Sequence, residues 1–244
     1  MNATRADLVW QASNVVSRYL NGVRGALPLA AEQIEMMLTL LATGRPVERF
    51  LDLGCGDGVL GAAILERYPQ AQGVLADFSA PMLAAGREKL AHLAGQARFV
   101  QLDYAVPTWA SLAPGPFDAV VSGYSIHHQP DGRKATLYQE IFDLLAPGGW
   151  FVNIEHVAPG NELTSELFSE HIINGWYNAQ LGGENARTRE DLSAAFYRSS
   201  DRAANILAPV ETQCTWLRQI GYQDVDCYLK IYELAVFAGR RPKP

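Results

Sequence analysis

The sequence has few cysteines and no long apolar run. Cys55, Cys214 and Cys227 are its 3 cysteines; they lie too far apart for a CxxC metal pattern, and their odd number excludes a complete set of disulfide bonds. No apolar stretch approaches the roughly 18 residues that cross a membrane, and Arg5 and Asp7 stand where a signal peptide needs an apolar run. We therefore expect a reducing, cytoplasmic location, no metal site and no membrane partner.

Positive charge is also scarce. The chain has 20 Lys and Arg against 26 Asp and Glu, a net charge of −6, and the basic residues are scattered. A nucleic-acid backbone would be attracted weakly to such a chain, so we expect no nucleic-acid partner. The chain does have apolar material, with 48% hydrophobic and 19% charged residues, which suffices for one globular core. We expect residues 1–244 to form a single domain, whose oligomeric state the sequence does not predict.

Helical spacing of apolar residues alternates with short β-like runs, which is typical of an α/β fold with a parallel sheet. An N-terminal segment, residues 1–44, is expected to hold helices at 6–20 and 29–41. Five strands are expected at 50–53, 73–76, 98–102, 117–121 and 150–154, with helices at 60–68, 79–93 and 134–145. A Pro-Gly-Gly run at 147–149 predicts the end of the last helix.

The pattern changes after the fifth expected strand. Residues 162–200 contain two polar-faced helical stretches, and we interpret them as a helical lid inserted into the domain. A helix at 210–220 ends at Gly221, and the runs 225–231 and 234–238 can pair as an antiparallel hairpin. The predicted fold is therefore a seven-stranded, doubly wound α/β sheet with an antiparallel C-terminal hairpin, N-terminal helices and a lid.

A glycine-rich loop, GCGDG at 54–58, follows the first expected strand. Such a loop places free backbone N–H groups at the carboxyl edge of the sheet, where these folds bind nucleotide-like ligands. Residues 56–61 satisfy the dinucleotide pattern G-x-G-x-x-G, but counted from Gly54 the third glycine position is Val59. Asp52 and Asp57 flank the loop, which contains no Lys or Arg, so a cation suits it better than a pyrophosphate.

S-adenosylmethionine (SAM) has a sulfonium, an ammonium and no phosphate, and its ribose needs an acid about twenty residues after the loop, where Asp77 stands. Here the sequence resembles the class I SAM-dependent methyltransferases. FLDLGCGDG at 50–58 and VLADFS at 74–79 match their first two motifs. The later motifs are matched by LDY at 102–104, FDAVVSGYSIHH at 117–128 and LLAPGGWF at 144–151. The resemblance covers residues 45–157 and implies a Rossmann-like fold with SAM as cofactor.

The resemblance also implies roles for individual residues around the methionine and ribose of SAM. Gly54 and Gly56 would approach the methionine part, with Ser122 beside it. Asp77 would bind the ribose hydroxyls, unless it only interacts with the dipole of the following helix. Asp52 would either organise the loop or reach the ammonium group.

At the other end of the cofactor, Phe78 and Met82 would flank the adenine or pack in the core. Asp103 and Tyr104 would meet the adenine amino group and edge. A further similarity lies upstream: Tyr19 and Arg24 resemble the Tyr…Arg…Pro pattern that precedes the first motif in several small-molecule methyltransferases and in carboxy-SAM synthase. There the resemblance implies that the arginine pairs with the cofactor carboxylate.

Methyl transfer is an in-line displacement, so the protein chiefly has to align the reactants and exclude water. A phenol, amine or acid acceptor also needs a base, for which the strand ends offer His127, His128, Glu155 and His156. Each of these could instead satisfy loop backbone groups. The final helix and hairpin resemble those of the same families and support the fold only.

Trp176 and Tyr177 in the lid present flat apolar faces that suit an aromatic acceptor or a sulfonium, or simply pack the lid. Four arginines of the same segment make an acidic acceptor conceivable: Arg187, Arg189, Arg198 and Arg202. Acidic residues alternate with them, and a solvated, self-paired helix is the expectation.

We expect the protein to transfer the methyl group of SAM to a small organic acceptor. An alternative is a SAM-modifying enzyme of the same fold that uses SAM itself, by carboxymethyl formation or by intramolecular cyclisation or lyase-type displacement, because the layout also resembles carboxy-SAM synthase. A nicotinamide-dependent oxidoreductase is disfavoured by Val59 and the acidic loop. A non-catalytic SAM-binding protein is the remaining alternative.

Overall fold

The computed structural model describes residues 5–21, 27–180 and 186–244. The helices are η1 (Ala6–Gln11), α1 (Ser13–Asn21), α2 (Ala30–Ala42), α3 (Val59–Arg67), α4 (Ala80–Lys89), η3 (Ala91–Leu93), η4 (Trp109–Leu112), η5 (Ile126–His128), α5 (Asp131–Leu144), α6 (Glu162–Ala179), α7 (Arg189–Tyr197), α8 (Ser200–Ala203) and α9 (Val210–Ile220). The strands are β1 (Arg49–Leu53), β2 (Gln72–Asp77), β3 (Ala97–Gln101), β4 (Phe117–Gly123), β5 (Leu145–His156), β6 (Gln223–Ile231) and β7 (Leu234–Arg240).

The strands form one sheet in the order β3-β2-β1-β4-β5-β7-β6. Strands β1 to β5 are parallel, whereas β7 runs antiparallel to β5 and to β6. The predicted seven-stranded doubly wound sheet with its antiparallel hairpin is thus confirmed. The strand order reverses between β1 and β4, and in such sheets a crevice opens at the carboxyl ends of the strands at this point.

Two apolar layers cover the sheet because alternate residues of each strand point to opposite faces. Leu51, Val120 and Phe151 lie on the face covered by α5 and α9. Phe50, Val121 and Val152 lie on the face covered by α2, α3 and α4. Both layers consist of fully buried side chains, so the carboxyl ends of the strands are held rigidly in place.

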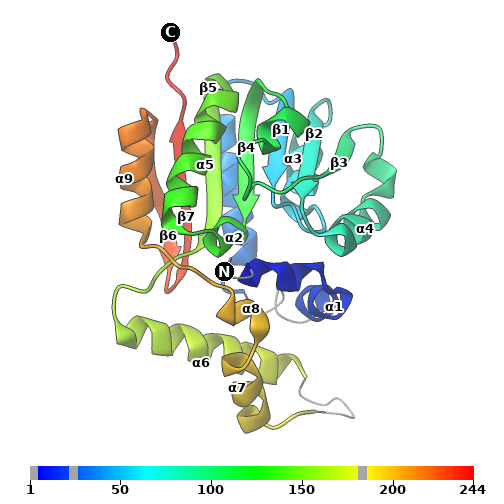
Figure 1. Cartoon of the computed structure of the whole chain (residues 1–244), viewed down its shortest axis with the longest axis vertical. Helices are drawn as coiled ribbons and strands as arrows, with labels where there is room; N and C mark the ends of the chain where they lie inside the picture. Colours follow the sequence, from blue (N-terminus) through cyan, green and yellow to red (C-terminus); the bar gives the residue numbers. More distant parts are fainter. Residues whose placement is uncertain (1–4, 22–26, 181–185) are drawn as a thin grey trace.

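The predicted lid segment forms helices with a small apolar cluster of their own. Phe168, Ile172 and Ile173 of α6 pack against Leu192 and Phe196 of α7. The short helix α8, which the sequence did not indicate, follows them. Figure 1 shows α6, α7 and α8 beyond one end of the sheet, with η1 and α1 beside them and the C-terminus at the opposite end.

Two predicted boundaries are wrong. The single helix expected at 6–20 is broken at Ala12, which has an extended backbone (φ −88°, ψ 122°) and separates η1 from α1. Helix α5 ends at Leu144, before the Pro-Gly-Gly run, and β5 continues through that run. Its register shifts there, because Phe117 pairs with Leu145 whereas Ala119 pairs with Trp150. The run is therefore an irregularity inside a strand and not a helix stop.

The close packing of the sheet depends on a glycine in β2. Gly73 pairs with Phe50 of β1, whose ring lies over the glycine backbone. A Cβ atom at residue 73 would lie 2.3 Å from Cζ of Phe50, which is far too short for a carbon–carbon contact. Because Phe50 is fully buried, its ring has no open space to move into.

We predict that Gly73→Ala lowers the free energy of unfolding by about 1–3 kcal/mol, as expected for overpacking of a filled core. Urea unfolding followed by circular dichroism measures the change. Gly95→Ala is the matched control, since its added Cβ would meet nothing within 4 Å and should change stability by no more than about 0.5 kcal/mol. Equal midpoints for the two variants would contradict the packing argument.

Candidate active site

A pocket of about 390 Å³, pocket 1, lies at the carboxyl ends of the strands, at the reversal point between β1 and β4. Its walls come from the loops after β1, β2 and β4, from Tyr104 beyond β3, and from residues of η1, α1 and α2. The loops converge there because parallel strands end at a common edge. The sequence motifs at 54–58 and 74–79 thus meet in one cavity.

The glycine loop after β1 needs a left-handed backbone and a close approach. Gly54 has φ +72° and Gly56 has φ +54°, conformations that favour glycine. A Cβ at residue 54 would lie 1.9 Å from Oγ of Ser125, so a side chain is excluded there. At residue 56 a Cβ would come within 3.7 Å only of Sδ of Met82, across the pocket. A ligand can therefore lie directly against the backbone of this loop.

Asp77, the last residue of β2, links the glycine loop to the next helix. Its Oδ2 accepts the backbone N–H of Gly56 at 2.9 Å, and its Oδ1 accepts that of Ser79 at 2.8 Å. Burial raises the pKa of Asp77 to about 6, and these backbone donors oppose the rise. The carboxylate lines pocket 1, so the helix-capping role and a ligand-binding role are compatible.

The described lining of pocket 1 includes four aspartates and neither Lys nor Arg: Asp7, Asp52, Asp57 and Asp77. Behind the lining, Arg5 pairs with Asp7 and Lys89 with Asp57, each at 2.7 Å. Oδ2 of Asp52 accepts the N–H of Gly61 at 2.8 Å, so Asp52 does organise the loop. This lining fits the ammonium and sulfonium of SAM and would repel a pyrophosphate.

Most of the residues expected at the cofactor line pocket 1. Beyond Asp52, Gly54, Gly56 and Asp77, the lining includes Tyr19, Phe78, Met82 and Tyr104. The hydroxyl of Tyr104 hydrogen-bonds to the carbonyl of Ser125 at 2.9 Å and lies 2.6 Å from its Oγ. Cys55 is a buried lining residue whose burial raises its thiol pKa, which makes it an inert filler.

Three expected cofactor residues are placed differently. Asp103 is absent from the lining and is held by Arg5, whose Nη1 lies 2.5 Å from Oδ2. Ser122 is fully buried within β4, and Gly123 lines the pocket instead. Strand β4 runs to Gly123, two residues beyond its predicted end, so Ser122 lies inside the strand and its side chain is fully buried. Arg24 lies outside the described residues.

Trp10, a residue that no sequence motif indicated, also lines pocket 1. Its carbonyl accepts the hydroxyl of Ser79 at 2.6 Å, and its indole Nε1–H donates to Nε2 of His128 at 2.9 Å. These bonds fix η1 across the mouth of pocket 1. The only sequence signal is a tryptophan on a short N-terminal segment, which a motif search does not single out.

A second pocket of about 110 Å³, pocket 2, adjoins the first. The two pockets share Trp10, Tyr19, Leu27, Tyr124 and His128 in their linings. The remaining walls of pocket 2 come from the end of β5, the start of β7 and helices α6 to α8. Two ligands bound side by side would thus meet at these shared residues.

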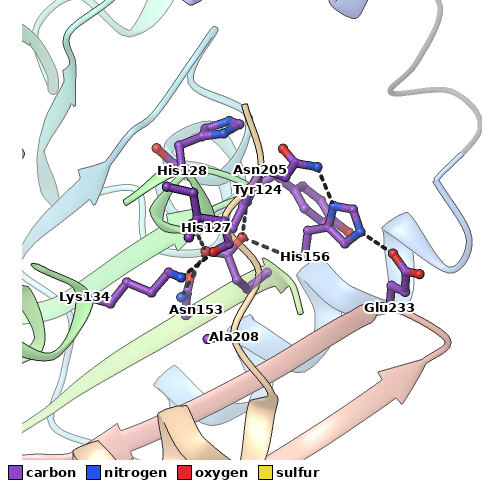
Figure 2. A network of polar contacts seen from close by, with 12 residues as sticks. Tyr124, His127, His128, Lys134, Asn153, His156, Asn205, Ala208 and Glu233 are labelled. Carbon is purple, nitrogen blue, oxygen red and sulfur yellow. Dashed lines mark hydrogen bonds and ion pairs between the residues drawn. The ribbon is translucent and has the colours of Figure 1, made fainter. Parts of the chain in front are cut away.

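A buried histidine–glutamate pair supports the wall of pocket 2, and its histidine, His127, is labelled in Figure 2. Nδ1 of His127 lies 2.6 Å from Oε1 of Glu155, and the two side chains are almost inaccessible to solvent. The carboxyl group also accepts the backbone N–H groups of His127 (3.0 Å) and His156 (2.8 Å). These donors favour the carboxylate form of Glu155, and to that form Nδ1 of His127 donates its proton, which leaves Nε2 as the basic nitrogen.

The other two histidines also have both ring nitrogens engaged. Nε2 of His156 lies 2.7 Å from the buried Glu233, and its Nδ1 lies 3.3 Å from Nδ2 of Asn205 (Figure 2). His128 accepts the indole N–H of Trp10 at Nε2, and its Nδ1 lies 3.3 Å from the carbonyl of Ala204. These two rings are therefore held in place by their partners.

The pKa directions agree with neutral rings. Burial, aided by the neighbouring His156 and Lys134, lowers the pKa of His127, while its interaction with Asn205 favours the protonated form. Burial lowers the pKa of His128 to about 3 and raises that of Glu155 to about 7. Glu155 lines neither pocket, and its contact with the lining is made through the ring of His127.

The two aromatic residues expected at the acceptor differ in position. Trp176 lines pocket 2 and meets the ring of Phe196 edge to face, with 5.7 Å between ring centroids. Tyr177 is absent from the lining and packs against the α6–α7 cluster. Of the two roles considered for Tyr177, an acceptor contact and packing of the lid, its position fits the packing of the lid.

No group of three or more His, Cys, Asp or Glu side chains in the described part of the chain could hold a metal ion. No helix within residues 5–21, 27–180 and 186–244 has the length and apolar character needed to span a bilayer.

Comparisons with known proteins place these features in a family. A family model described as a methyltransferase domain matches residues 50–149. A trans-aconitate 2-methyltransferase of an Azoarcus species is 31% identical over 192 residues, which cover 79% of this chain and 68% of the relative. A demethylmenaquinone methyltransferase of Thermus thermophilus is 38% identical over 120 residues, 49% of this chain and 52% of the relative.

Other similar proteins differ more in length. A ribosomal RNA small subunit methyltransferase C of Pasteurella multocida is 34% identical over 127 residues, 52% of this chain and 34% of the relative. The chain thus spans about half of the Thermus relative and a third of the Pasteurella relative. A solved structure of PigF with SAH shares the fold, with a TM-score of 0.62 at 16% identity over 99% of this chain and 63% of that chain.

We predict that SAM binds about tenfold more weakly at pH 5 than at pH 8. Asp77, with its pKa raised to about 6, is a carboxylate above that pH and loses its capacity to accept ribose hydroxyls as it is protonated below. Isothermal titration calorimetry across this range measures the change.

Asp77→Asn is the control for the assignment. It should weaken SAM binding by about 1–3 kcal/mol at pH 8, the cost of a lost charged hydrogen bond, and should abolish the pH dependence. If the variant keeps the wild-type affinity, Asp77 does not contact SAM. If it keeps the wild-type dependence of affinity on pH, another group is responsible for that dependence.

Proposed function

The chain belongs to the class I SAM-dependent methyltransferases, and from this membership we propose that it transfers the methyl group of SAM to a small organic acceptor. The observation that carries the proposal is the pair of adjoining pockets. Pocket 1 has an acidic lining and a glycine loop that suit SAM, and pocket 2 has an aromatic lining that suits a second small molecule.

We assign SAM to pocket 1 with its ribose on Asp77, its methionine part along Gly54 and Gly56, and its adenine between Phe78 and Met82. When bound there, SAM supplies a methyl group activated by the adjacent sulfonium. Tyr19 lines both pockets and would stand beside the reacting centre. Asp103 has no place in this assignment because Arg5 occupies its carboxylate.

We assign the general base to His127. Its Nδ1–H is held by Glu155, so Nε2 is directed away from Glu155, and the ring lines pocket 2. Nε2 receives the proton of an acceptor hydroxyl while the acceptor oxygen forms its bond to the methyl carbon and the carbon–sulfur bond breaks. The imidazolium that results is stabilised by Glu155 at Nδ1 and by Asn205. Glu155 is a positioning residue in this scheme.

The lid segment at 162–200 would exclude water from this reaction. Helices α6 and α7 form the outer wall of pocket 2, and their apolar cluster reaches Leu234 at the start of β7. We propose that residues 1–244 act as one domain whose lid closes over the acceptor. Three free thiols, of which Cys55 and Cys214 are buried, support a reducing location such as the cytoplasm.

Several observations favour a small acceptor. The relatives named for trans-aconitate and demethylmenaquinone suggest small molecules, and the trans-aconitate relative matches 79% of this chain. The relative named for ribosomal RNA matches 52% of it, and a net charge of −6 gives an RNA backbone little attraction. The existence of a second pocket also argues against SAM being its own substrate, the alternative from sequence.

The decisive experiment is incubation of the purified protein with SAM, alone and with a panel of small phenols, amines and acids, followed by mass spectrometry of all small products. The proposal expects S-adenosylhomocysteine and a methylated acceptor in equal amounts, and intact SAM when no acceptor is added. Consumption of SAM alone beyond its spontaneous decay would establish SAM as the substrate. Hydride transfer with an added nicotinamide cofactor would refute methyl transfer.

We predict that His127→Gln lowers kcat for a hydroxyl acceptor about 10²- to 10⁴-fold, the contribution of a general base, without changing SAM affinity. Glu155→Gln should lower kcat less, because the base remains but loses its orientation. Stopped assays of methyl transfer measure kcat, and calorimetry measures the affinity for SAM, so that a loss of catalysis is distinguished from a loss of cofactor binding.

The exposed His92 provides the control, since His92→Gln changes a histidine far from both pockets and should leave kcat unchanged. Wild-type kcat in a folded, SAM-binding His127→Gln variant would exclude His127 as the base.

A further inference from the structure

We infer that pocket 2 selects an acceptor that carries a carboxylate, bound by Arg202 of α8. The inference rests on the proposed function and names the substrate class of the same site. Arg202 is the only permanently charged residue in the described lining of pocket 2, which contains no Asp or Glu. Its three lining histidines are His127, His128 and His156, and burial lowers the pKa of the first two.

The charges of the two pockets are therefore segregated. The described lining of pocket 1 includes four aspartates and neither Lys nor Arg, whereas that of pocket 2 includes one arginine and neither Asp nor Glu. The first lining attracts a cation and the second attracts an anion. A cationic methyl donor and an anionic acceptor would each be drawn to its own pocket and repelled from the other.

Aromatic rings hold Arg202 at the wall of pocket 2. The guanidinium carbon lies 4.6 Å from the ring centroid of the buried Phe196 and 5.6 Å from that of Tyr197. Such contacts fix the guanidinium plane and leave its N–H groups for a ligand. In the described part of the chain, no Asp or Glu forms an ion pair with Arg202. A planar, half-buried guanidinium is well suited to bind a carboxylate through two hydrogen bonds.

The neighbouring arginines of the lid have other partners or positions. Arg189 is paired with Glu170 and bonds to Asn174 at 3.0 Å. Arg187 donates to the backbone carbonyl of Asp191 at 2.9 Å. Arg198 is exposed and does not line pocket 2. The expectation of a solvated, self-paired segment thus fits its other arginines, and Arg202 departs from it by facing the pocket.

The local chain path places Arg202 close to the proposed base. The carbonyl of Arg202 accepts the N–H of Asn205 at 3.2 Å, and the side chain of Asn205 contacts both His156 and His127. The same segment is bonded directly to η5, because the backbone N–H of Ile206 donates to the carbonyl of His127 at 2.9 Å, and both Arg202 and His127 line pocket 2. One end of a small acceptor can meet the guanidinium while the other meets Nε2 of His127.

The size and lining of pocket 2 suggest a single ring. Its volume of about 110 Å³ is on the scale of the cavities of about 150 Å³ that hold benzene. Trp176, Phe168 and Phe196 supply flat or apolar faces for that ring. The acceptor class that meets all these conditions is a monocyclic aromatic carboxylate with a hydroxyl group, such as a hydroxybenzoate.

The test compares hydroxybenzoates with the matching hydroxybenzamides, which keep the ring and hydroxyl but lack the charge. Binding of each isomer is measured by calorimetry in the presence of S-adenosylhomocysteine, whose own binding is measured first. In the wild-type protein we expect at least one hydroxybenzoate to bind tenfold or more tightly than its amide. Arg202→Gln should remove this preference, and Arg202→Lys should restore part of it.

Arg198→Gln is the matched control, because it removes an equal charge from the same segment outside pocket 2, and it should keep the full preference. Equal binding of acid and amide, a preference that survives in Arg202→Gln, or no binding of any isomer to the S-adenosylhomocysteine complex would overturn the inference while leaving the methyltransferase proposal intact. Failure of S-adenosylhomocysteine itself to bind would overturn both.

Discussion

The arrangement of pocket 2 depends on one buried carboxylate, that of Glu155 at the end of β5. It accepts the backbone N–H groups of His127 and His156 and orients the imidazole of His127. A carboxylate buried this deeply is tolerated only because several donors surround it, and it fixes the chain of η5 against the sheet edge in return. Lys134, also buried, bonds to the carbonyl of Ile206 and holds the segment after α8 at the same place. The walls of pocket 2 therefore converge on a rigid centre.

Much of the fold was predictable because parallel strands leave strong local signals. Each buried strand is a short apolar run, and the glycine loop at 54–58 and Asp77 are fixed by local backbone requirements: a left-handed turn in one case, and a carboxylate bonded to two nearby N–H groups in the other. The same locality explains the two wrong boundaries. Ala12 breaks a helix whose apolar spacing is intact, and the Pro-Gly-Gly run is absorbed by β5 through its pairing with β4, a contact between distant segments.

The parts of the site that escaped prediction depend on how the folded chain packs. Asp103 follows β3 as the family pattern requires, but Arg5 comes from the far end of the chain to occupy it. Ser122 is buried inside β4, which continues two residues beyond its expected end. Arg202 looked like one of four similar arginines, and only the packing of Phe196 and Tyr197 distinguishes it. The composition of a segment and the spacing of its residues do not predict which charged side chain lines a pocket.

Trp10 lines both pockets, and its two hydrogen bonds have a consequence for the order of events. Its carbonyl is tied to Ser79 on the side of pocket 1, and its indole is tied to His128 beside pocket 2. Whatever displaces η1 to admit a ligand to the first pocket must also release the wall of the second. A shared wall of this kind makes the two affinities reciprocally linked, so the occupant of either pocket sets how readily its neighbour arrives and departs.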